Sequence, residues 1–402
     1  MIHATAPATP LQAPDNALGR RTLIVASMAH ALHDGYTDTI FVLLPVWQTE
    51  FGLGYGVIAM LRGLYAGAMA GLQVPAGSLA DRMGGRTVLV LGTALASLGY
   101  LLAGFTGSLP GLCLALAAAG AGSSTQHPVG SAAVARAYGS RARGPLGVYN
   151  FSGDLGKAAF PAAASLLLMR LPWRGTLWLM AAFGLAIAVA IGLFMPATVP
   201  PAQARAPEAV RQGGGRGGFS LLFAIGVIDT AVRMGLLTFL PFLLKGKGAA
   251  LPTIGLGFAM VFLGGAGGKF TCGWLGGRLG VLWTVVLTEG GTAAAILLVL
   301  ALPLTPALAV LPLLGIMLNG TSSVLYGTVP ELSAADQAER SFALFYTGTI
   351  GAGAVSPVLY GLLGDAVGVT WATAATAITA LATLPLAVAL APHLARDRDR
   401  LT

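Results

Sequence analysis

The chain has 402 residues, of which 55% are hydrophobic and only 9% are charged. Soluble globular domains carry about 25% charged residues, so this chain has too few polar groups to cover a water-exposed surface of its size. The composition therefore argues against a soluble protein and predicts an integral membrane protein. The formal net charge is +8, but the basic residues do not form a patch with interleaved aromatic residues, which argues against nucleic-acid binding. We interpret the positive charge as a signal of the orientation of the chain in the membrane.

A membrane-spanning helix needs about 20 mostly apolar residues, and segments of this kind recur along the whole chain. They predict six N-terminal helices near residues 22–48, 56–80, 87–106, 109–138, 144–169 and 174–195, and six C-terminal helices near residues 219–244, 253–276, 281–303, 306–329, 341–364 and 369–391. The stretch between the two sets contains four prolines and three successive glycines, which predicts a linker. We therefore expect an all-α membrane protein of twelve transmembrane helices. Its parts are an N-terminal bundle over 1–195, a cytoplasmic linker over 196–218 and a C-terminal bundle over 219–402.

The two halves of the chain repeat each other at an offset of 196 residues. This shift places Pro45 on Pro241, Gly77 on Gly273, Arg82 on Arg278, Gly84 on Gly280 and Pro161 on Pro357. Two parallel six-helix repeats related about the membrane normal are a transporter architecture, with the substrate path between the halves.

Positive charge is distributed unequally between the loops of this arrangement. Fifteen of the 23 Lys and Arg residues fall on the side that holds both termini and the linker, and four fall on the other side. Because cytoplasmic loops are enriched in Lys and Arg, we expect both termini in the cytoplasm. The remaining four fall inside expected spans: Arg62, Lys157, Arg233 and Lys269. Of these, Arg62 lies near the start of its span and is expected at the membrane interface.

The loop after the second expected span reads Gly77-Ser78-Leu79-Ala80-Asp81-Arg82-Met83-Gly84-Gly85-Arg86. It resembles the G-x-L-a-D-R-x-G-R-K loop motif of the major facilitator superfamily. We expect Gly77, Asp81, Arg82, Gly84 and Arg86 to form a cytoplasmic gate, in which the charged groups latch neighbouring helices in one state of transport.

A finer resemblance is carried by the first and fourth spans. His30-Ala31-Leu32-His33-Asp34 resembles the H-x-x-x-D opening of fosmidomycin-resistance-type exporters, and Gly122-Ser123-Ser124-Thr125-Gln126-His127-Pro128 resembles their G-S-S-x-x-H-P segment. The resemblance implies proton-coupled efflux of a small polar or amphipathic compound by alternating access. It departs at Asp154 and Lys157, where that group has uncharged polar or small residues.

A proton-coupled importer of a small organic anion remains an alternative. Phe160 precedes Pro161 where drug exporters often have a glycine, so the export signature is incomplete. The basic residues Lys157, Arg233 and Lys269 would suit an anion in either direction.

Ionisable residues inside the expected spans are the candidates for function. Each costs about 2.5–3.5 kcal/mol at membrane depth, so each needs a partner or a role. His30, Asp34 and Asp38 share one face of the first span at spacings of four residues. Because histidines and buried carboxylates bind and release protons near neutral pH, we assign proton coupling to Asp34, His30, His33 and Asp154.

Substrate contacts are expected from polar residues of six spans. They are His127, Gln126, Asn150, Lys157, Asp229, Arg233, Lys269, Asn319 and Tyr346. Structural roles are the alternative for two groups: Gln126 and His127 would satisfy a carbonyl freed by Pro128, and Asp154 and Lys157 would simply pair.

A membrane hydrolase is the rival from another class, since Ser123 and Ser124 lie within reach of His127 on a helix. No orienting acid or oxyanion device accompanies them, so we expect no enzymatic activity. We expect no cofactor and no metal, with the proton gradient as the energy source. The expected partners are a small-molecule substrate, protons and the lipid bilayer. The expected state is a monomer in the plasma membrane, the inner membrane of a bacterium, with no nucleic-acid partner.

Overall fold

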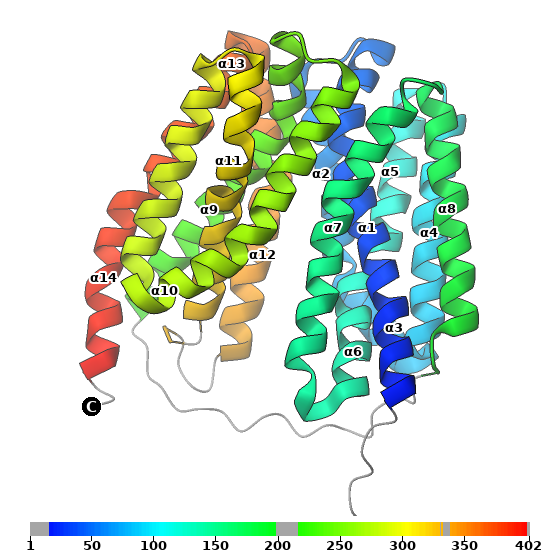
Figure 1. The fold of residues 1–402 in the computed structure, drawn as a ribbon, viewed down its shortest axis with the longest axis horizontal. Helices are drawn as coiled ribbons and strands as arrows, with labels where there is room; N and C mark the ends of the chain where they lie inside the picture. Colours follow the sequence, from blue (N-terminus) through cyan, green and yellow to red (C-terminus); the bar gives the residue numbers. More distant parts are fainter. Residues whose placement is uncertain (1–15, 198–215, 330, 333–337, 400–402) are drawn as a thin grey trace, which may run out of the picture.

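The computed structural model describes residues 16–197, 216–329, 331–332 and 338–399. These residues are helical almost throughout (Figure 1). The N-terminal elements are α1 (Asn16–Phe51), α2 (Tyr55–Gly71), α3 (Gln73–Met83), α4 (Gly85–Phe105), α5 (Leu109–Ser123), the π-helical turn η1 (Gln126–Gly130), α6 (Ser131–Tyr138), the 3-10 turn η2 (Gly139–Arg141), α7 (Arg143–Leu167) and α8 (Trp173–Phe194). The C-terminal elements are α9 (Arg216–Gly246), α10 (Leu251–Ala301), α11 (Leu304–Thr328), α12 (Ala338–Val367), α13 (Val369–Leu381) and α14 (Thr383–Asp399).

Each expected span coincides with one of these helices or with a broken pair of them. Among the described residues, eight helices are long and apolar enough to cross a membrane, and the bent pair α2–α3 makes nine. Helix α10 supplies two of the eight, Leu251–Lys269 and Trp274–Ala301. The three other expected spans coincide with α1, the α5–η1–α6 segment and α7. Of these, α1 and α7 carry polar and charged residues that lower their mean hydropathy, and α5 is 15 residues long, so none of the three is among the eight.

Glycines with positive φ separate helices at equivalent positions of the two repeats. Gly84 ends α3 with φ +85°, and Gly280 interrupts α10 with φ +77°. Residues with a Cβ rarely adopt this backbone conformation, so the sequence repeat marks a turn that requires glycine. In the fourth span, Pro128 lies within η1, where the helix widens because proline removes a backbone donor.

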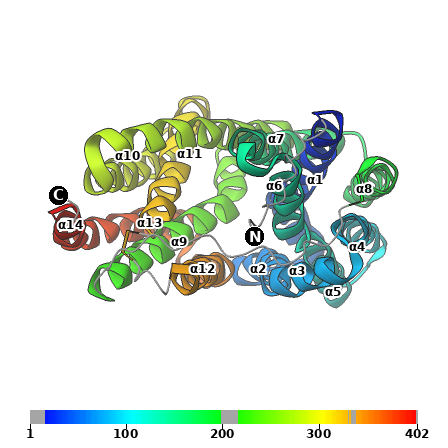
Figure 2. The ribbon, with the colours of Figure 1, turned by 90° about the horizontal axis from the view of Figure 1, so that it is seen from below.

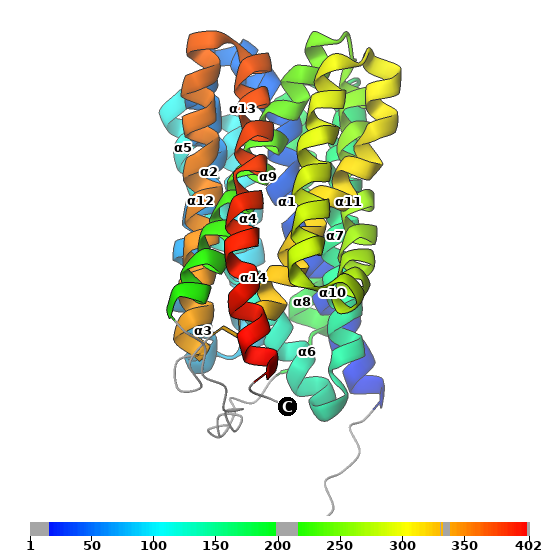
Figure 3. The same ribbon diagram turned by 90° about the vertical axis from the view of Figure 1, so that its left-hand side faces the viewer.

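The helices form two groups, α1–α8 and α9–α14 (Figure 1; seen from one end in Figure 2). Within both groups the helices run along a common direction (Figure 3). Helix α2 packs against α12, α7 packs against α10, and α1 packs against α9 and α10, so these contacts join the groups. The division at residues 195 and 219 stays a prediction, because residues 198–215 of the expected linker lie outside the described part.

Contacts between the groups concentrate at the end of the molecule where α1 ends and α2 begins. Asp365 of α12 accepts hydrogen bonds from the backbone N–H groups of Tyr55 and Gly56, at 2.6 and 2.9 Å. The rings of Phe41 and Phe258 stack with centroids 5.5 Å apart. At the opposite end, α3 and α6 pack against helices of their own group. The groups are therefore tied together at one end.

Candidate functional site

Helix α1 packs closely along α7, and glycines of α7 permit this approach. A Cβ atom on Gly156 would lie 2.1 Å from the carbonyl oxygen of Ala31. A Cβ atom on Gly153 would lie 2.6 Å from Asp34 Oδ2 and 2.7 Å from His30 Nε2. Small residues let membrane helices approach where larger side chains would separate them. The polar face of α1 is consequently buried, as its helical spacing predicts.

Six ionisable side chains meet beside this contact. We call them the Asp34–Asp154 cluster: His30, Asp34, His127, Asp154, Lys157 and Lys269. Lys157 Nζ lies 3.2 Å from Asp34 Oδ2 and 3.9 Å from Asp154 Oδ1. Lys269 Nζ donates to both carboxylate oxygens of Asp154, at 2.6 and 2.7 Å. Because Lys269 is on α10 and Asp154 on α7, this ion pair joins the two helix groups.

His30 is oriented so that its second nitrogen faces Asp34. Nδ1 donates to the backbone carbonyl of Tyr149 at 2.8 Å, and the Tyr149 ring stacks on the imidazole with centroids 4.2 Å apart. Nε2 then lies 3.4 Å from Asp34 Oδ2 and has no hydrogen-bond partner. A neutral imidazole presents a lone pair to the carboxylate there, whereas a protonated one donates a charge-assisted hydrogen bond. The Nε2 atom of His30 thus faces the Asp34 carboxylate across the contact of α1 with α7.

The basic groups form the accessible side of the cluster. The side chains of Lys157, Lys269 and His127 are 30%, 40% and 42% exposed, whereas those of Asp34 and Asp154 are 8% and 11% exposed. An approaching solute therefore meets ammonium and imidazole groups before it meets a carboxylate. This arrangement suits an anionic group.

A metal ion is a poor match to the same residues. His30, Asp34 and His127 offer ligand-type atoms within 4.8 Å of one another. However, the Lys157 ammonium group lies 3.2 Å from Asp34 Oδ2 and would repel a divalent cation at that position. The geometry favours ion-pair and proton chemistry.

Arg62 is buried between helices, and its position relative to the membrane interface stays a prediction. Its Nη2 is 3.9 Å from Asp38 Oδ1, and its guanidinium lies over the Phe41 ring at 5.0 Å. Asp38 supplies the partner that its burial requires. With Arg233 and Tyr326, Arg62 lines a cavity of about 150 Å³ between the helix groups. A charged residue inside an apolar span was the feature of the sequence that indicated the need for a buried partner.

Two residues expected to act in transport are held in hydrogen bonds within the first helix group. His33 contacts the hydroxyls of Ser123 and Thr93, each at 3.0 Å, and forms no ion pair among the described residues. The Gln126 amide donates to the Ala26 carbonyl and to the Tyr149 hydroxyl. These contacts give both residues a structural role between helices of the first group, and the Gln126 partner is the Ala26 carbonyl of α1 instead of a carbonyl freed by Pro128. Tyr149, which sequence reasoning missed, connects Gln126 with His30 and stands next to the candidate Asn150.

The remaining expected contacts are dispersed. Asn150 is exposed, Asn319 donates to the Gly315 carbonyl of its own helix at 3.1 Å, and half-exposed Tyr346 packs on Tyr326. Asp229 is buried in the second group and contacts Glu289 instead of a cluster member.

The expected gate residues lie at the end of α3 and the start of α4. Gly77, Asp81 and Arg82 are on α3, Gly84 forms the turn, and Arg86 begins α4. Asp81 and Arg82 are exposed, and no ion pair among the described residues includes Asp81. The expected latch is therefore not formed in this state.

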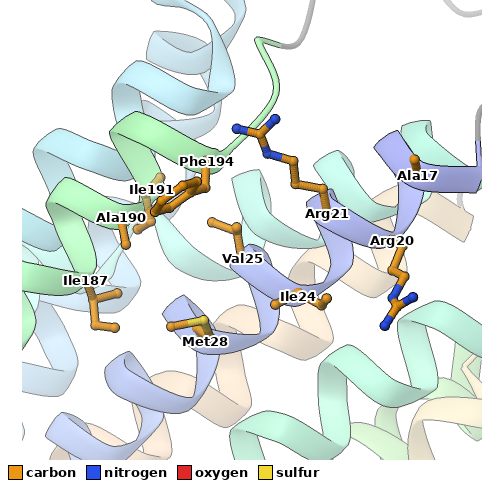
Figure 4. A pocket seen from close by; sticks show the side chains of 10 residues that line it. All are labelled: Ala17, Arg20, Arg21, Ile24, Val25, Met28, Ile187, Ala190, Ile191 and Phe194. Atoms are coloured by element: carbon orange, nitrogen blue, oxygen red, sulfur yellow. The ribbon is translucent and has the colours of Figure 1, made fainter.

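A larger cavity lies away from the cluster, between α1 and α8 (Figure 4). It has a volume of about 550 Å³ and is lined mainly by apolar side chains such as Ile24, Met28 and Ile191. Arg20 and Arg21 are its charged lining residues. Arg21 donates to the Leu193 carbonyl, and none of the residues that line this cavity belongs to the Asp34–Asp154 cluster.

Comparison with known proteins agrees with this architecture. The family model of the Major Facilitator Superfamily matches residues 26–224. The chain belongs to the major facilitator superfamily. Its relatives and its fold are those of transporters and not of enzymes, so it is a multi-pass membrane transporter of a small molecule. The hydrolase alternative paired Ser123 and Ser124 with His127, whereas Ser123 contacts Tyr65 and His33 and Ser124 donates to the Ala121 carbonyl.

Two curated relatives of this superfamily member are similar to different extents. The Fosmidomycin resistance protein of Escherichia coli K12 is 28% identical over 163 residues, which cover 40% of this chain and 40% of that protein. Monocarboxylate transporter 11 of Homo sapiens is 25% identical over 387 residues, which cover 89% of this chain and 80% of that protein. The matched segment thus spans less than half of the first relative and most of the second.

A solved structure has the same fold. It is a bacterial homolog of the human lysosomal transporter Spinster in an inward-facing and unoccupied conformation. The TM-score is 0.81 at 14% identity, with 95% of this chain and 99% of that chain covered.

Proposed function

We propose that this transporter moves a small organic anion together with protons, by alternating access of a site between its two helix groups. The Lys269–Asp154 ion pair carries the proposal: a partly exposed ammonium group of one helix group is held by a nearly buried carboxylate of the other. An anionic substrate is the competitor that such an ammonium group would accept, through charge-assisted hydrogen bonds. The name of Monocarboxylate transporter 11 supports the same class of substrate.

Charge balance in the cluster links proton uptake to anion binding. Lys157 and Lys269 neutralise Asp34 and Asp154. An anion that replaces a carboxylate beside an ammonium group leaves that carboxylate buried without a partner, which costs about 3–5 kcal/mol. Protonation of the displaced carboxylate removes this cost, so the anion and the proton bind more tightly together than alone.

Release of the proton reverses the process. The carboxylate regains its charge and pairs again with the ammonium group, and the anion is then bound less tightly. Because the Lys269–Asp154 pair joins α10 to α7, its breaking and re-forming also change the contacts between the helix groups. This connects substrate binding to the movement that alternating access requires.

Proton-driven efflux of a small polar or amphipathic compound is the second candidate. The identity with the Fosmidomycin resistance protein favours it, together with the His30–Asp34 and Ser123–Pro128 motifs. In such an antiporter, substrate and proton compete for Asp34 instead of binding together. The two candidates therefore differ in whether substrate binding strengthens or weakens proton binding, which can be measured.

Proteoliposomes that contain a pH-sensitive dye distinguish the candidates. When a monocarboxylate is added outside without an imposed gradient, symport acidifies the lumen, whereas antiport makes it alkaline. Lys269→Met is expected to abolish the anion-dependent signal, and Arg170→Met, at an exposed position, is expected to retain it. An alkaline change, or no change with monocarboxylates and larger organic anions, contradicts the proposal.

The proposal also includes the setting of the protein. We place it as a monomer in the plasma membrane, the inner membrane of a bacterium, with both termini cytoplasmic. It then needs no cofactor, and the proton gradient is its energy source. The excess of Lys and Arg in the loops on the side of the termini supports this orientation. The end where α12 binds α2 would then be the outer end.

A further inference from the structure

Two buried carboxyl groups meet in the second helix group, away from the Asp34–Asp154 cluster. Asp229 of α9 is 3% exposed and Glu289, in the second arm of α10, is 2% exposed. Their side chains contact each other. Asp229 Oδ2 and Glu289 Oε2 have no donor partner, and no ion pair among the described residues includes either group.

Two ionised carboxylates cannot occupy this position together. In a water-excluded interior they repel each other, and each buried acceptor atom without a donor carries a desolvation cost. One proton between the groups removes the repulsion and supplies a donor to a pair that otherwise holds only acceptors. The nearest cation, Arg233, is one turn along α9, and its Nη atoms reach Ser322 and Thr230 at 3.5 Å. Arg233 therefore lies close enough to act on both carboxyl groups but forms no ion pair with either among the described residues.

A chain of hydroxyl groups continues from Glu289. Thr321 Oγ1 lies 2.7 Å from Glu289 Oε1 and 2.7 Å from Thr288 Oγ1, and Thr288 Oγ1 lies 2.8 Å from the Thr284 carbonyl. Each hydroxyl has one hydrogen to donate. Because the shared proton lies between the two carboxyl groups, Glu289 Oε1 accepts the hydrogen of Thr321, and the Thr321 oxygen can in turn accept from Thr288.

The sequence repeat places a hydrogen-bonded pair at the same point of the first helix group. The offset of 196 residues carries Asp229 to His33 and Glu289 to Thr93. His33 Nε2 and Thr93 Oγ1 are 3.0 Å apart and share one hydrogen. The equivalent contact in the second group involves two carboxyl groups, which share a hydrogen only if one of them is protonated.

We propose that Asp229 and Glu289 form a second proton-binding site, which holds one proton between the two carboxyl groups and exchanges it during transport. When the proton leaves, the Asp229 carboxylate is free to turn to Arg233, its neighbour at i+4. Arg233 lines the cavity between the helix groups together with Arg62, so loss of the proton changes the charge at that cavity. The inference rests on the proposed function only in assigning the exchange to transport.

Infrared spectroscopy of the purified full-length protein tests the site without any substrate. A protonated carboxyl group gives a C=O stretching band that is distinct from carboxylate bands. Glu289→Gln and Asp229→Asn each supply an amide donor to the remaining carboxylate, so each is expected to remove the band of one carboxyl group per molecule. Glu50→Gln is the matched control, because Glu50 is exposed and pairs with Arg174 at 2.8 Å.

The results separate this inference from the anion proposal. An unchanged band in both variants, with wild-type melting temperatures, overturns the shared proton. Absence of any protonated-carboxyl band from the wild-type protein overturns it without reference to a variant. In D2O an exchangeable proton shifts the band to lower frequency, and an unshifted band overturns the exchange. A failure of anion transport in liposomes leaves all three readouts unaffected.

Discussion

The ion pair between Lys269 and Asp154 should be worth much more than a surface pair of similar geometry. Lys269→Met removes an ammonium group that donates to both oxygens of a carboxylate whose side chain is 11% exposed. Loss of one partner of a buried pair costs about 3–5 kcal/mol. Lys269 is itself 40% exposed, and Lys157 remains 3.9 Å from Asp154, so both reduce the loss. We expect a coupling energy of about 2 kcal/mol, below the fully buried case.

A double-mutant cycle isolates this coupling. The variants are Lys269→Met, Asp154→Asn and the double substitution, and the measurement is the free energy of unfolding by reversible denaturation in mixed micelles. The double variant should be more stable than the sum of the single losses predicts, because it leaves no carboxylate without its partner.

The pair formed by Arg174 and Glu50 is the control for this cycle. Its atoms are 2.8 Å apart, but its side chains are 33% and 37% exposed. Exposed pairs contribute about 0.2–1 kcal/mol. A coupling for Lys269 and Asp154 no larger than that of the control would refute the reasoning, since burial would then add nothing to the contact between the helix groups.

Three further substitutions test the packing that supports the site. Asp365→Ala removes two hydrogen bonds to the start of α2, at a cost of about 1–2 kcal/mol, and should lengthen the distance between spin labels on α2 and α12. An unchanged distance distribution would contradict the closure of that end. Gly153→Ala places a methyl group against the polar face of α1 and should abolish proton-coupled transport in a folded protein, whereas Gly147→Ala, at a position with open space around it, should retain transport. Equal transport activities of the two variants would show that the close approach of α7 to α1 is unnecessary. Gly280→Ala forces a residue with a Cβ into a positive-φ conformation and should lower the stability by about 1–2 kcal/mol, whereas Gly277→Ala should not. Equal melting temperatures of the two variants would contradict a requirement for glycine at this turn.

The helices and their repeat could be predicted from the sequence because hydropathy and turn residues are local signals. The expected fourth span, 109–138, has the same limits as the α5–η1–α6 segment, and the repeat correctly paired Gly84 with Gly280 as turns. The buried face of His30 and Asp34 followed from helical spacing alone.

Contacts between helices distant in sequence could not be predicted in this way. Nothing local to Lys269 indicates that Asp154 is its partner, because the pair depends on how α7 packs against α10. His33 differs from His30 for a similar reason: on one helix, a shift of three residues turns the imidazole from a carboxylate toward hydroxyl groups. The contact of Arg62 with Asp38 was missed for the same reason, because the two residues lie on different helices.

Proton uptake on anion binding tests the central claim most directly. The purified transporter is mixed with a monocarboxylate in weakly buffered detergent solution, and the change in proton concentration is recorded alongside the bound anion. The account predicts that the wild-type protein takes up protons as the anion binds, and that folded Asp34→Asn takes up fewer and loses gradient-driven transport. Anion binding with release of protons, or with no proton change at all, would contradict it.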